Sequence, residues 1–263
     1  MTATHRPRSL SAERRTADDH RLAADLAQRA GELLVELRGR LISQEAPAAV
    51  LRAEGDRQAH ELLATELAAA RPADAVLSEE GSDDTSRLDA ERVWIVDPLD
   101  GTREYSEPGR TDWAVHVALV IAERPVAGAV ALPALGLTLS TADPPRLPVA
   151  SPGPPRLVVS RSRPPRQADV VAAALGAEMA PLGSAGAKAM AVVRGEADVY
   201  VHAGGQYEWD SCAPAAVAAA TGCAVSRLDG SDLRYNQPDV YLPDLVVCRP
   251  ELAGPVLAAL TTR

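Results

Sequence analysis

Near the start of the chain, apolar residues recur at three- and four-residue steps, a spacing that places them on one face of a helix. The first such stretch opens with Thr16 and Asp19, a pair typical of helix capping. Its apolar positions are Leu22, Leu26, Ala30, Leu33, Leu34 and Leu37. The second stretch begins near Asp56 and reaches Ala70, where Arg71-Pro72 ends it. The pattern therefore predicts two amphipathic helices.

Shorter apolar runs, typical of β-strands, follow these helices. They lie at residues 75–78, 93–97, 113–121, 126–132 and 137–140. Further along, the strand-like runs are 157–159, 198–201 and 245–248, and the helix-like stretches between and after them are 167–175, 185–194, 211–220 and 251–260. This order predicts helices packed on a sheet in the first half of the chain, and alternating strands and helices in the second half.

Prolines crowd the segment between these two halves, residues 142–156. Because proline cannot donate a backbone hydrogen bond to a sheet, this segment is expected to be an extended connector. The sequence thus predicts a flexible N-terminal tail (1–15), an N-terminal α+β lobe (16–141), the connector (142–156) and a C-terminal α/β lobe (157–263).

Composition narrows the function classes. The 263-residue chain has 27 basic and 36 acidic side chains, a net charge of −9, and its aromatic residues are 3 Trp and 5 Tyr. An acidic chain with few aromatic residues is poorly suited to a nucleic acid polymer. No uninterrupted apolar run reaches the roughly 18 residues of a membrane span. The 3 cysteines include no CxxC pair, which favours a reducing, cytoplasmic setting over a disulfide framework or a zinc site.

The basic residues are almost all arginine, and Lys188 is the single lysine. Asparagine is equally rare and also occurs once. The scarcity of both residue types indicates a GC-rich coding sequence rather than a requirement of folding. Lys188 ends the segment 183–188, Gly-Ser-Ala-Gly-Ala-Lys, at a predicted helix start. A compact ammonium group suits a tight phosphate pocket better than a planar guanidinium. We therefore expect Lys188 to contact a phosphate group, and a lysine on a solvated helix face is the alternative.

Carboxylates gather where predicted strands and helices end. The strand at 93–97 runs into Asp97-Pro98-Leu99-Asp100-Gly101-Thr102, Glu79-Glu80 follows another strand, and Glu208-Trp209-Asp210 precedes a helix. Hard cations such as Mg²⁺ prefer oxygen ligands, and a cation relieves the repulsion between converging carboxylates. Taken singly, these groups also fit a plain turn, a solvated loop and a helix N-cap.

In combination, the Glu-Glu pair, Asp-Pro-Leu-Asp-Gly-Thr and the later Trp-Asp resemble the inositol monophosphatase superfamily of metal-dependent, lithium-sensitive phosphatases. Within it, the chain looks most like the CysQ-type 3′-phosphoadenosine 5′-phosphate phosphatases. The stretches that carry this narrower resemblance are 97–105, 183–188, 198–202 and 208–213. His202 departs from the arginine that many of these enzymes carry. The resemblance implies a layered αβαβα sandwich of the inositol monophosphatase and fructose-1,6-bisphosphatase type, an α/β (α+β) fold.

The resemblance also implies a reaction site. Two or three Mg²⁺ ions would be held by Glu79, Asp97, Asp100, Asp210 and the backbone carbonyl of Leu99, with inhibition by Li⁺ and by excess Ca²⁺. Thr102, oriented by Asp56 and assisted by Glu79, would activate the attacking water. The implied substrate contacts are Leu99, Asp100, Gly101, Thr102, Gly183, Ser184, Lys188, His202 and Asp210. We expect Lys188 to contact the second, non-reacting phosphate or the nucleotide part of the substrate.

The reaction implied is the hydrolysis of 3′-phosphoadenosine 5′-phosphate to AMP and phosphate, linked to sulfate assimilation. Hydrolysis of inositol 1-phosphate or fructose 1,6-bisphosphate on the same metal core is one alternative, and a non-catalytic metal or nucleotide sensor is another. A haloacid-dehalogenase-type phosphatase ranks lower, because its Asp-x-Asp-Gly-Thr motif is one residue shorter than residues 97–102. The expected partner is a small phosphorylated substrate, not a nucleic acid or a membrane, and the sequence leaves a homodimer open.

Overall fold

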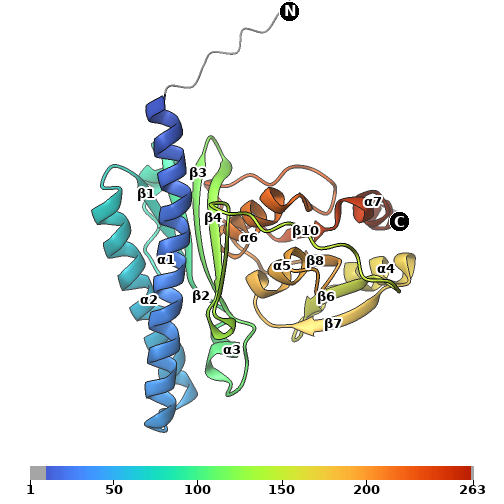
Figure 1. The fold of residues 1–263 in the computed structure, drawn as a ribbon, viewed down its shortest axis with the longest axis horizontal. Helices are drawn as coiled ribbons and strands as arrows, with labels where there is room; N and C mark the ends of the chain where they lie inside the picture. The colour runs from blue at the N-terminus through green and yellow to red at the C-terminus, as the bar shows by residue number, and fades with distance from the viewer. Residues whose placement is uncertain (1–9, 262–263) are drawn as a thin grey trace, which may run out of the picture.

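Two long helices open the fold in the computed structural model, which describes residues 10–261 (Figure 1). They are α1 (Leu10–Ser43) and α2 (Ala48–Ala70), so the two predicted helices are confirmed, although both begin earlier than predicted. Residues 1–9 of the predicted tail lie outside the described residues, whereas residues 10–15 belong to α1. The sequence pattern missed them because Ala, Glu and Arg favour a helix without extending its apolar stripe.

The first sheet contains the predicted strands of the first half of the chain. They are β1 (Ala75–Ser78), β2 (Arg92–Asp100), β3 (Ala114–Ile121), β4 (Arg124–Leu132) and β5 (Leu137–Ser140). The strand order in this 5-stranded sheet follows the chain, β1-β2-β3-β4-β5. Strand β1 runs parallel to β2, and the other pairs are antiparallel. The carboxyl ends of β1 and β2 therefore lie at the same edge.

The second sheet has the order β7-β6-β8-β10-β9. Its strands are β6 (Arg156–Ser160), β7 (Glu178–Leu182), β8 (Val199–Ala203), β9 (Ala224–Ser226) and β10 (Asp244–Cys248). The sequence predicts β6, β8 and β10 but neither β7 nor β9. Both are edge strands, and β7 is exposed along most of its length, so neither carries the apolar run that marks a buried strand.

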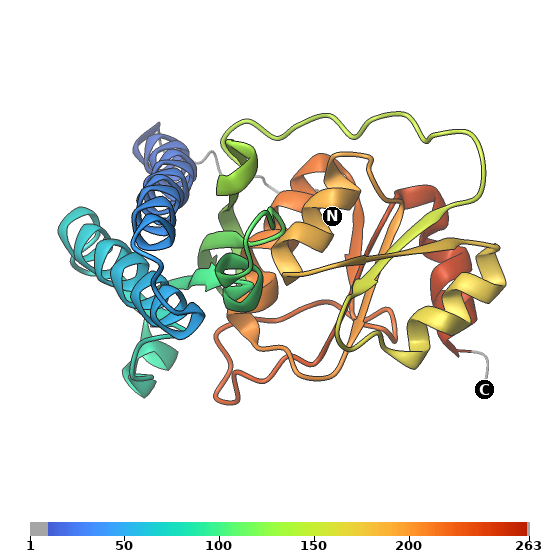
Figure 2. The same ribbon diagram turned by 90° about the horizontal axis from the view of Figure 1, so that it is seen from below.

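Helices separate and cover the two sheets, as Figures 1 and 2 show. The remaining helices are α3 (Thr102–Ser106), α4 (Arg166–Leu175), α5 (Ala185–Val193), α6 (Glu208–Thr221) and α7 (Ala253–Thr261), with short 3₁₀ turns at Thr85–Asp89, Pro133–Leu135 and Pro250–Leu252. Helices α1 and α2 cover the outer face of the first sheet, and α4 and α7 cover that of the second. Helices α5 and α6 lie between the sheets, which confirms the αβαβα sandwich.

One hydrophobic core joins the two halves of the chain. It runs from Val130 of the first sheet through Met190 of α5 and Val217 of α6 to Val247 of the second sheet. Between β5 and β6, residues 141–155 form an extended loop without helix or strand, where the sequence predicts the connector (Figure 2). Helices α5 and α6 therefore pack against both sheets. Residues at their N-terminal ends lie close to residues from both halves of the chain.

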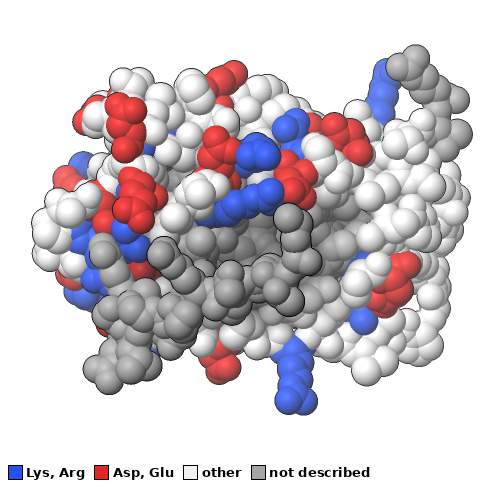
Figure 3. Space-filling view, turned by 90° about the horizontal axis from the view of Figure 1, so that it is seen from above, with Lys and Arg blue, Asp and Glu red and all other residues white. Residues whose placement is uncertain are grey.

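Basic and acidic side chains lie side by side on the face drawn in Figure 3, so charge of both signs is interspersed there. Among the helices of residues 10–261, none combines the length and the apolar character needed to cross a membrane.

Candidate active site

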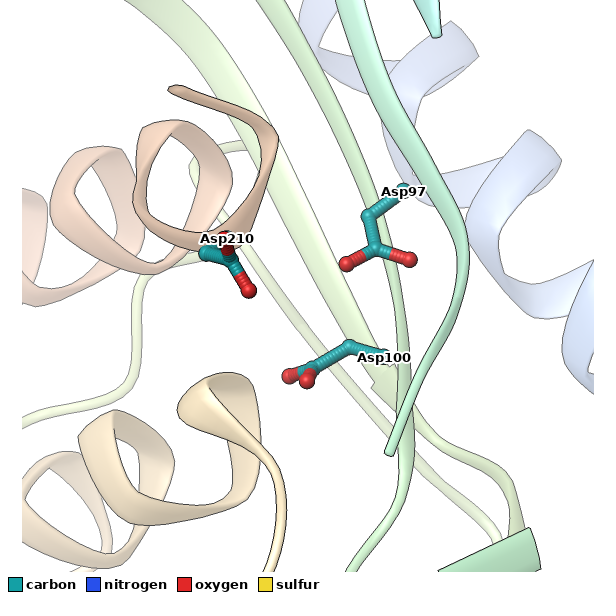
Figure 4. A group of neighbouring side chains, drawn as sticks. All are labelled: Asp97, Asp100 and Asp210. Carbon is teal, nitrogen blue, oxygen red and sulfur yellow. The ribbon is translucent and has the colours of Figure 1, made fainter. Parts of the chain in front are cut away.

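The end of β2 places two carboxylates on one side of the first sheet. Residues three apart on a regular strand face opposite sides. Between Asp97 and Asp100, however, the register of β2 against β3 shifts, at the position where Pro98 cannot donate to the ladder. Figure 4 shows both carboxylates pointing into a common space toward helix α6. The irregular end of β2 at Pro98 thus allows the carboxylates of Asp97 and Asp100 to point toward the same space.

Helix α6 supplies the third carboxylate. It begins at Glu208, so Asp210 lies in its first turn, not before the helix as the sequence pattern indicates. Its Oδ2 accepts a hydrogen bond of 2.7 Å from the backbone N–H of Tyr207. One oxygen each of Asp97, Asp100 and Asp210 lies within 4.8 Å of the others (Figure 4). These three side chains can hold a metal ion, and all three are ligands that the sequence predicts.

Crowding and burial perturb the pKa of the carboxylates. Burial, reinforced by the charges of Glu79 and Asp100, raises the pKa of Asp97 well above its usual value. Burial and Asp100 likewise raise the pKa of Asp210 to about 6. Asp97 and Asp210 therefore ionise less readily than exposed carboxyl groups, the behaviour expected where like charges converge in a buried place.

Asp100 behaves differently because it has partners for its charge. Burial alone would raise its pKa, but contacts with His116, the backbone N–H of Gly186 and the charge of Lys188 together lower it. The carboxylate accepts hydrogen bonds of 3.2 Å from the N–H of Ala185 and 2.6 Å from that of Gly186, at the start of α5. Asp100 therefore stays charged and joins the first sheet to the inner helix layer.

Glu79 lies beside this cluster, just after β1. Its backbone N–H donates to the carbonyl of Val96 over 3.3 Å, so β1 holds Glu79 next to β2. Its carboxyl group shares a hydrogen bond with Asp97, and burial followed by the charge of Asp210 raises its pKa to about 7. Glu79 contacts the three-carboxylate group but is not one of its members.

Thr102 and Asp56 meet as the sequence predicts. The hydroxyl of Thr102 lies 3.4 Å from Oδ1 of Asp56 and 3.2 Å from the carbonyl oxygen of Leu99. Burial, followed by the charge of Glu80, raises the pKa of Asp56 to about 6. The preceding Gly101 has a φ of 86°, and a Cβ there would lie 2.9 Å from Cβ of Ser184. Only glycine allows this turn beside the start of α5.

A pocket of about 600 Å³ opens beside these residues. Its lining includes most of the substrate contacts that the sequence predicts: Asp100, Gly101, Thr102, Gly183, Ser184, Lys188, His202 and Asp210. Its volume lies within the range of small-molecule sites. Asp97 and the predicted contact Leu99 are not part of this lining. The pocket combines Asp100, Gly101 and Thr102 of the first half of the chain with residues of the second half.

Lys188 is almost fully buried at the pocket wall. Its Nζ donates to the carbonyl oxygens of Gly183 and Ser184, the latter over 2.7 Å, and lies 5.4 Å from the centre of the Tyr200 ring. These bonds use two of its three N–H groups. The solvated helix face is excluded, and the predicted phosphate contact stays a prediction.

His202 lies on the same wall. Burial, followed by the charge of Lys188, lowers its pKa to about 4, so the imidazole is neutral near pH 7. Its Nε2 lies 2.8 Å from the carbonyl oxygen of Gly204 and donates to it. His202 can therefore offer hydrogen bonding to a ligand but not the positive charge of the arginine that many CysQ-type enzymes carry.

His116 is a part of the site that the sequence does not identify. The strand pattern indicates a half-buried packing residue, whereas the imidazole is fully buried between β3 and α6. Its Nε2 lies 3.1 Å from Oδ2 of Asp100 and its Nδ1 3.0 Å from the carbonyl oxygen of Trp209. A Cβ on Gly186 would run into the ring, which explains the second glycine of the 183–188 segment. No local signal reveals these contacts, because their partners are far apart in the sequence.

We expect the metal-free protein to lose thermal stability between pH 5 and pH 8. Folding raises the pKa of Glu79 to about 7 and that of Asp210 to about 6, so the folded chain binds more protons than the unfolded chain in this window. The stability that such groups contribute is complete below their unfolded pKa and is lost as pH passes the folded value. The unfolding midpoint, measured in EDTA, should fall by several degrees. A midpoint that rises across this window would contradict the proposed crowding.

Comparisons with known proteins agree with this geometry. The model of the inositol monophosphatase family matches residues 18–262. A 3′-phosphoadenosine 5′-phosphate phosphatase of Mycobacterium leprae is 51% identical, over 98% of this chain and 98% of that protein, and one of Mycobacterium bovis is 52% identical, over 88% and 89%. The crystal structure of CysQ from Bacteroides thetaiotaomicron superimposes with a TM-score of 0.75 at 26% identity, covering 89% of this chain and 97% of that one. The resemblance that the motifs indicate is confirmed: the chain belongs to the inositol monophosphatase family.

Proposed function

We propose that this protein is a Mg²⁺-dependent phosphatase that hydrolyses 3′-phosphoadenosine 5′-phosphate to AMP and phosphate. The observation that carries the proposal is the convergence of Asp97, Asp100 and Asp210, of which Asp100 and Asp210 line a pocket of about 600 Å³. The names of the relatives at 51% and 52% identity support this substrate. A link to sulfate assimilation, a cytoplasmic location and a homodimer stay predictions.

The residues present fit a hard divalent cation. Their donor atoms are all oxygens, and the raised pKa values of Asp97 and Asp210 indicate repulsion that a cation would relieve. We propose that Glu79, Asp97, Asp100, Asp210 and the carbonyl oxygen of Leu99 hold two or three Mg²⁺ ions. When bound, Mg²⁺ stabilises negative charge on the phosphate and makes a water molecule more acidic.

The pair Thr102 and Asp56 suits the orientation of the attacking water. With its hydroxyl hydrogen directed to Asp56, Oγ1 of Thr102 presents a lone pair that can accept a hydrogen bond from that water. Asp56, with a pKa of about 6, is mostly ionised at pH 7 and can receive a proton through Thr102. We propose that Glu79 shares the proton transfer. A non-catalytic sensor would not need such a pair, so the pair favours an enzyme.

Substrate contacts follow from the pocket wall. We propose that the backbone N–H groups of Gly101 and Thr102 and the segment Gly183-Ser184 approach the scissile phosphate and the ribose. Lys188 and His202 line the same pocket. Because His202 is neutral, its expected contact is a hydrogen bond to a hydroxyl or to the base.

A substrate panel tests the proposal. Phosphate release would be measured in Mg²⁺ with 3′-phosphoadenosine 5′-phosphate, inositol 1-phosphate and fructose 1,6-bisphosphate. We expect the nucleotide to give the highest kcat/KM, because the pocket offers contacts on several sides beyond the reacting phosphate. A higher value for either sugar-type phosphate would replace the proposed substrate by that alternative. Binding of the nucleotide without phosphate release would support the sensor.

A further inference from the structure

Four cationic side chains line the pocket, and they differ in what they already bind. They are Arg103, Arg161, Arg163 and Lys188. The guanidinium of Arg161 donates to Glu104 over 2.7 Å and to Glu107 over 2.9 Å, and Lys188 donates to two carbonyl groups. Arg161 and Lys188 are therefore already engaged in hydrogen bonds within the protein, and we call such cations committed.

Arg103 and Arg163 are not committed. Both are exposed, and within residues 10–261 no hydrogen bond, ion pair or ring contact involves either guanidinium. An exposed arginine is usually unremarkable, since lone surface charges are common. Here, however, both face the pocket that contains Asp100 and Asp210. A ligand that engages them breaks no existing ion pair.

The two arginines come from different halves of the chain but line the same pocket. Arg103 lies in α3 of the first half of the chain, next to Glu104, and Arg163 follows β6 of the second half, two residues after Arg161. The bond between Arg161 and Glu104 ties the two segments together. Arg163 also lies close to Gly205 of the same lining, since its Nη1 is 3.7 Å from the position that a Cβ would take on that glycine.

We propose that Arg103 and Arg163 bind the second phosphate of the substrate, the one that is not hydrolysed. This inference rests on the proposed function, which places the scissile phosphate at the carboxylate end of the pocket. A free guanidinium offers paired N–H donors that match phosphate oxygens, and such charge-assisted bonds are strong. The two arginines thereby select a bisphosphate over a monophosphate. They replace Lys188 as the expected partner of this phosphate, because Lys188 already donates to the carbonyl groups of Gly183 and Ser184.

The experiment compares two nucleotides that differ only in the second phosphate, adenosine 3′,5′-bisphosphate and adenosine 3′-monophosphate. For the full-length chain in Mg²⁺, kcat/KM is expected to favour the bisphosphate. In Arg103→Gln and Arg163→Gln the ratio of the two kcat/KM values should fall roughly tenfold each, as expected for a lost charge-assisted hydrogen bond. The double variant should come close to a ratio of one. Arg163→Lys, which keeps the charge, should recover part of the ratio.

Arg166→Gln is the matched control. Arg166 is an exposed arginine at the start of α4, close to Arg163 in sequence but outside the pocket lining, so its loss removes the same charge without the contact. Inhibition by the product 5′-AMP, which keeps the second phosphate, gives a second measurement. It should weaken in the two pocket variants and not in the control, whereas inhibition by adenosine should change little.

The outcomes separate this inference from the proposed function. If the wild-type chain hydrolyses the bisphosphate and both pocket variants keep the wild-type ratio, the inference is wrong and the proposed function stands. A wild-type chain that treats both nucleotides alike also overturns the inference. If the wild-type chain hydrolyses neither nucleotide but releases phosphate from another substrate, the proposed function fails, and the assignment of the arginines fails with it.

Discussion

Replacing Asp210 by asparagine is expected to lower turnover by several orders of magnitude and to leave the fold intact. Asparagine has the shape of aspartate but lacks the charge that makes it a ligand for a hard cation. Its side-chain oxygen can still accept the hydrogen bond that Asp210 receives from the N–H of Tyr207, so the first turn of α6 keeps its cap. Phosphate release at saturating Mg²⁺ measures the loss, and the far-UV circular dichroism spectrum checks the fold.

The equivalent change at Asp100 should remove activity as well but act differently on stability. Burial raises the pKa of Asp210, so Asp210→Asn removes a charge that the metal-free fold disfavours and should raise the unfolding midpoint in EDTA. The charge of Asp100 is stabilised by His116 and two backbone N–H groups, so Asp100→Asn should lower that midpoint. Near-normal turnover in either variant would overturn the metal assignment, and equal shifts in midpoint would contradict the distinction between the two carboxylates.

Removal of divalent cations should abolish hydrolysis. Burial and mutual repulsion outweigh the nearby positive charges at Asp97 and Asp210 and raise the pKa of both, so the phosphate of a substrate would meet a crowded negative site. Activity should vanish in EDTA and return with Mg²⁺. At a concentration of roughly 100 times its Kd, Mg²⁺ should also stabilise the fold by about 2.7 kcal/mol.

Two other cations sharpen this test. Li⁺ should inhibit because it can occupy a metal position without divalent charge, and excess Ca²⁺ should inhibit because its coordination is larger and looser. EDTA already saturated with Mg²⁺ is the control for effects of the chelator itself. Full activity in free EDTA would refute the metal-dependent mechanism.

Buried helices and strands are the elements that the sequence predicts best. Strands β2, β3 and β4 lie between covering helices and carry long apolar runs that identify them. The sequence does not predict helix α3, because five residues are too few to show a helical period. It forms where the left-handed Gly101 ends β2, so its position is set by the strand rather than by its own sequence.

The candidate site divides in the same way. Asp97, Asp100 and Thr102 could be identified because they share one short motif, and Asp210 because it follows a tryptophan in a second motif. His116 and Arg163 could not, since their roles depend on packing between distant segments. His116 contacts the carbonyl group of Trp209, 93 positions away in the sequence, and Arg163 lines the same pocket as His202 through the pairing of β6 with β8.

The division of the site between the two halves of the chain has a consequence during synthesis. Asp97 and Asp100 leave the ribosome long before Asp210, and the loop 141–155 separates them from the second sheet and from α5 and α6. Until α6 has docked against the first sheet, the nascent chain holds only part of the proposed set of metal ligands. On the proposed function, the chain can therefore bind metal only late in folding, when the core shared by both sheets has formed.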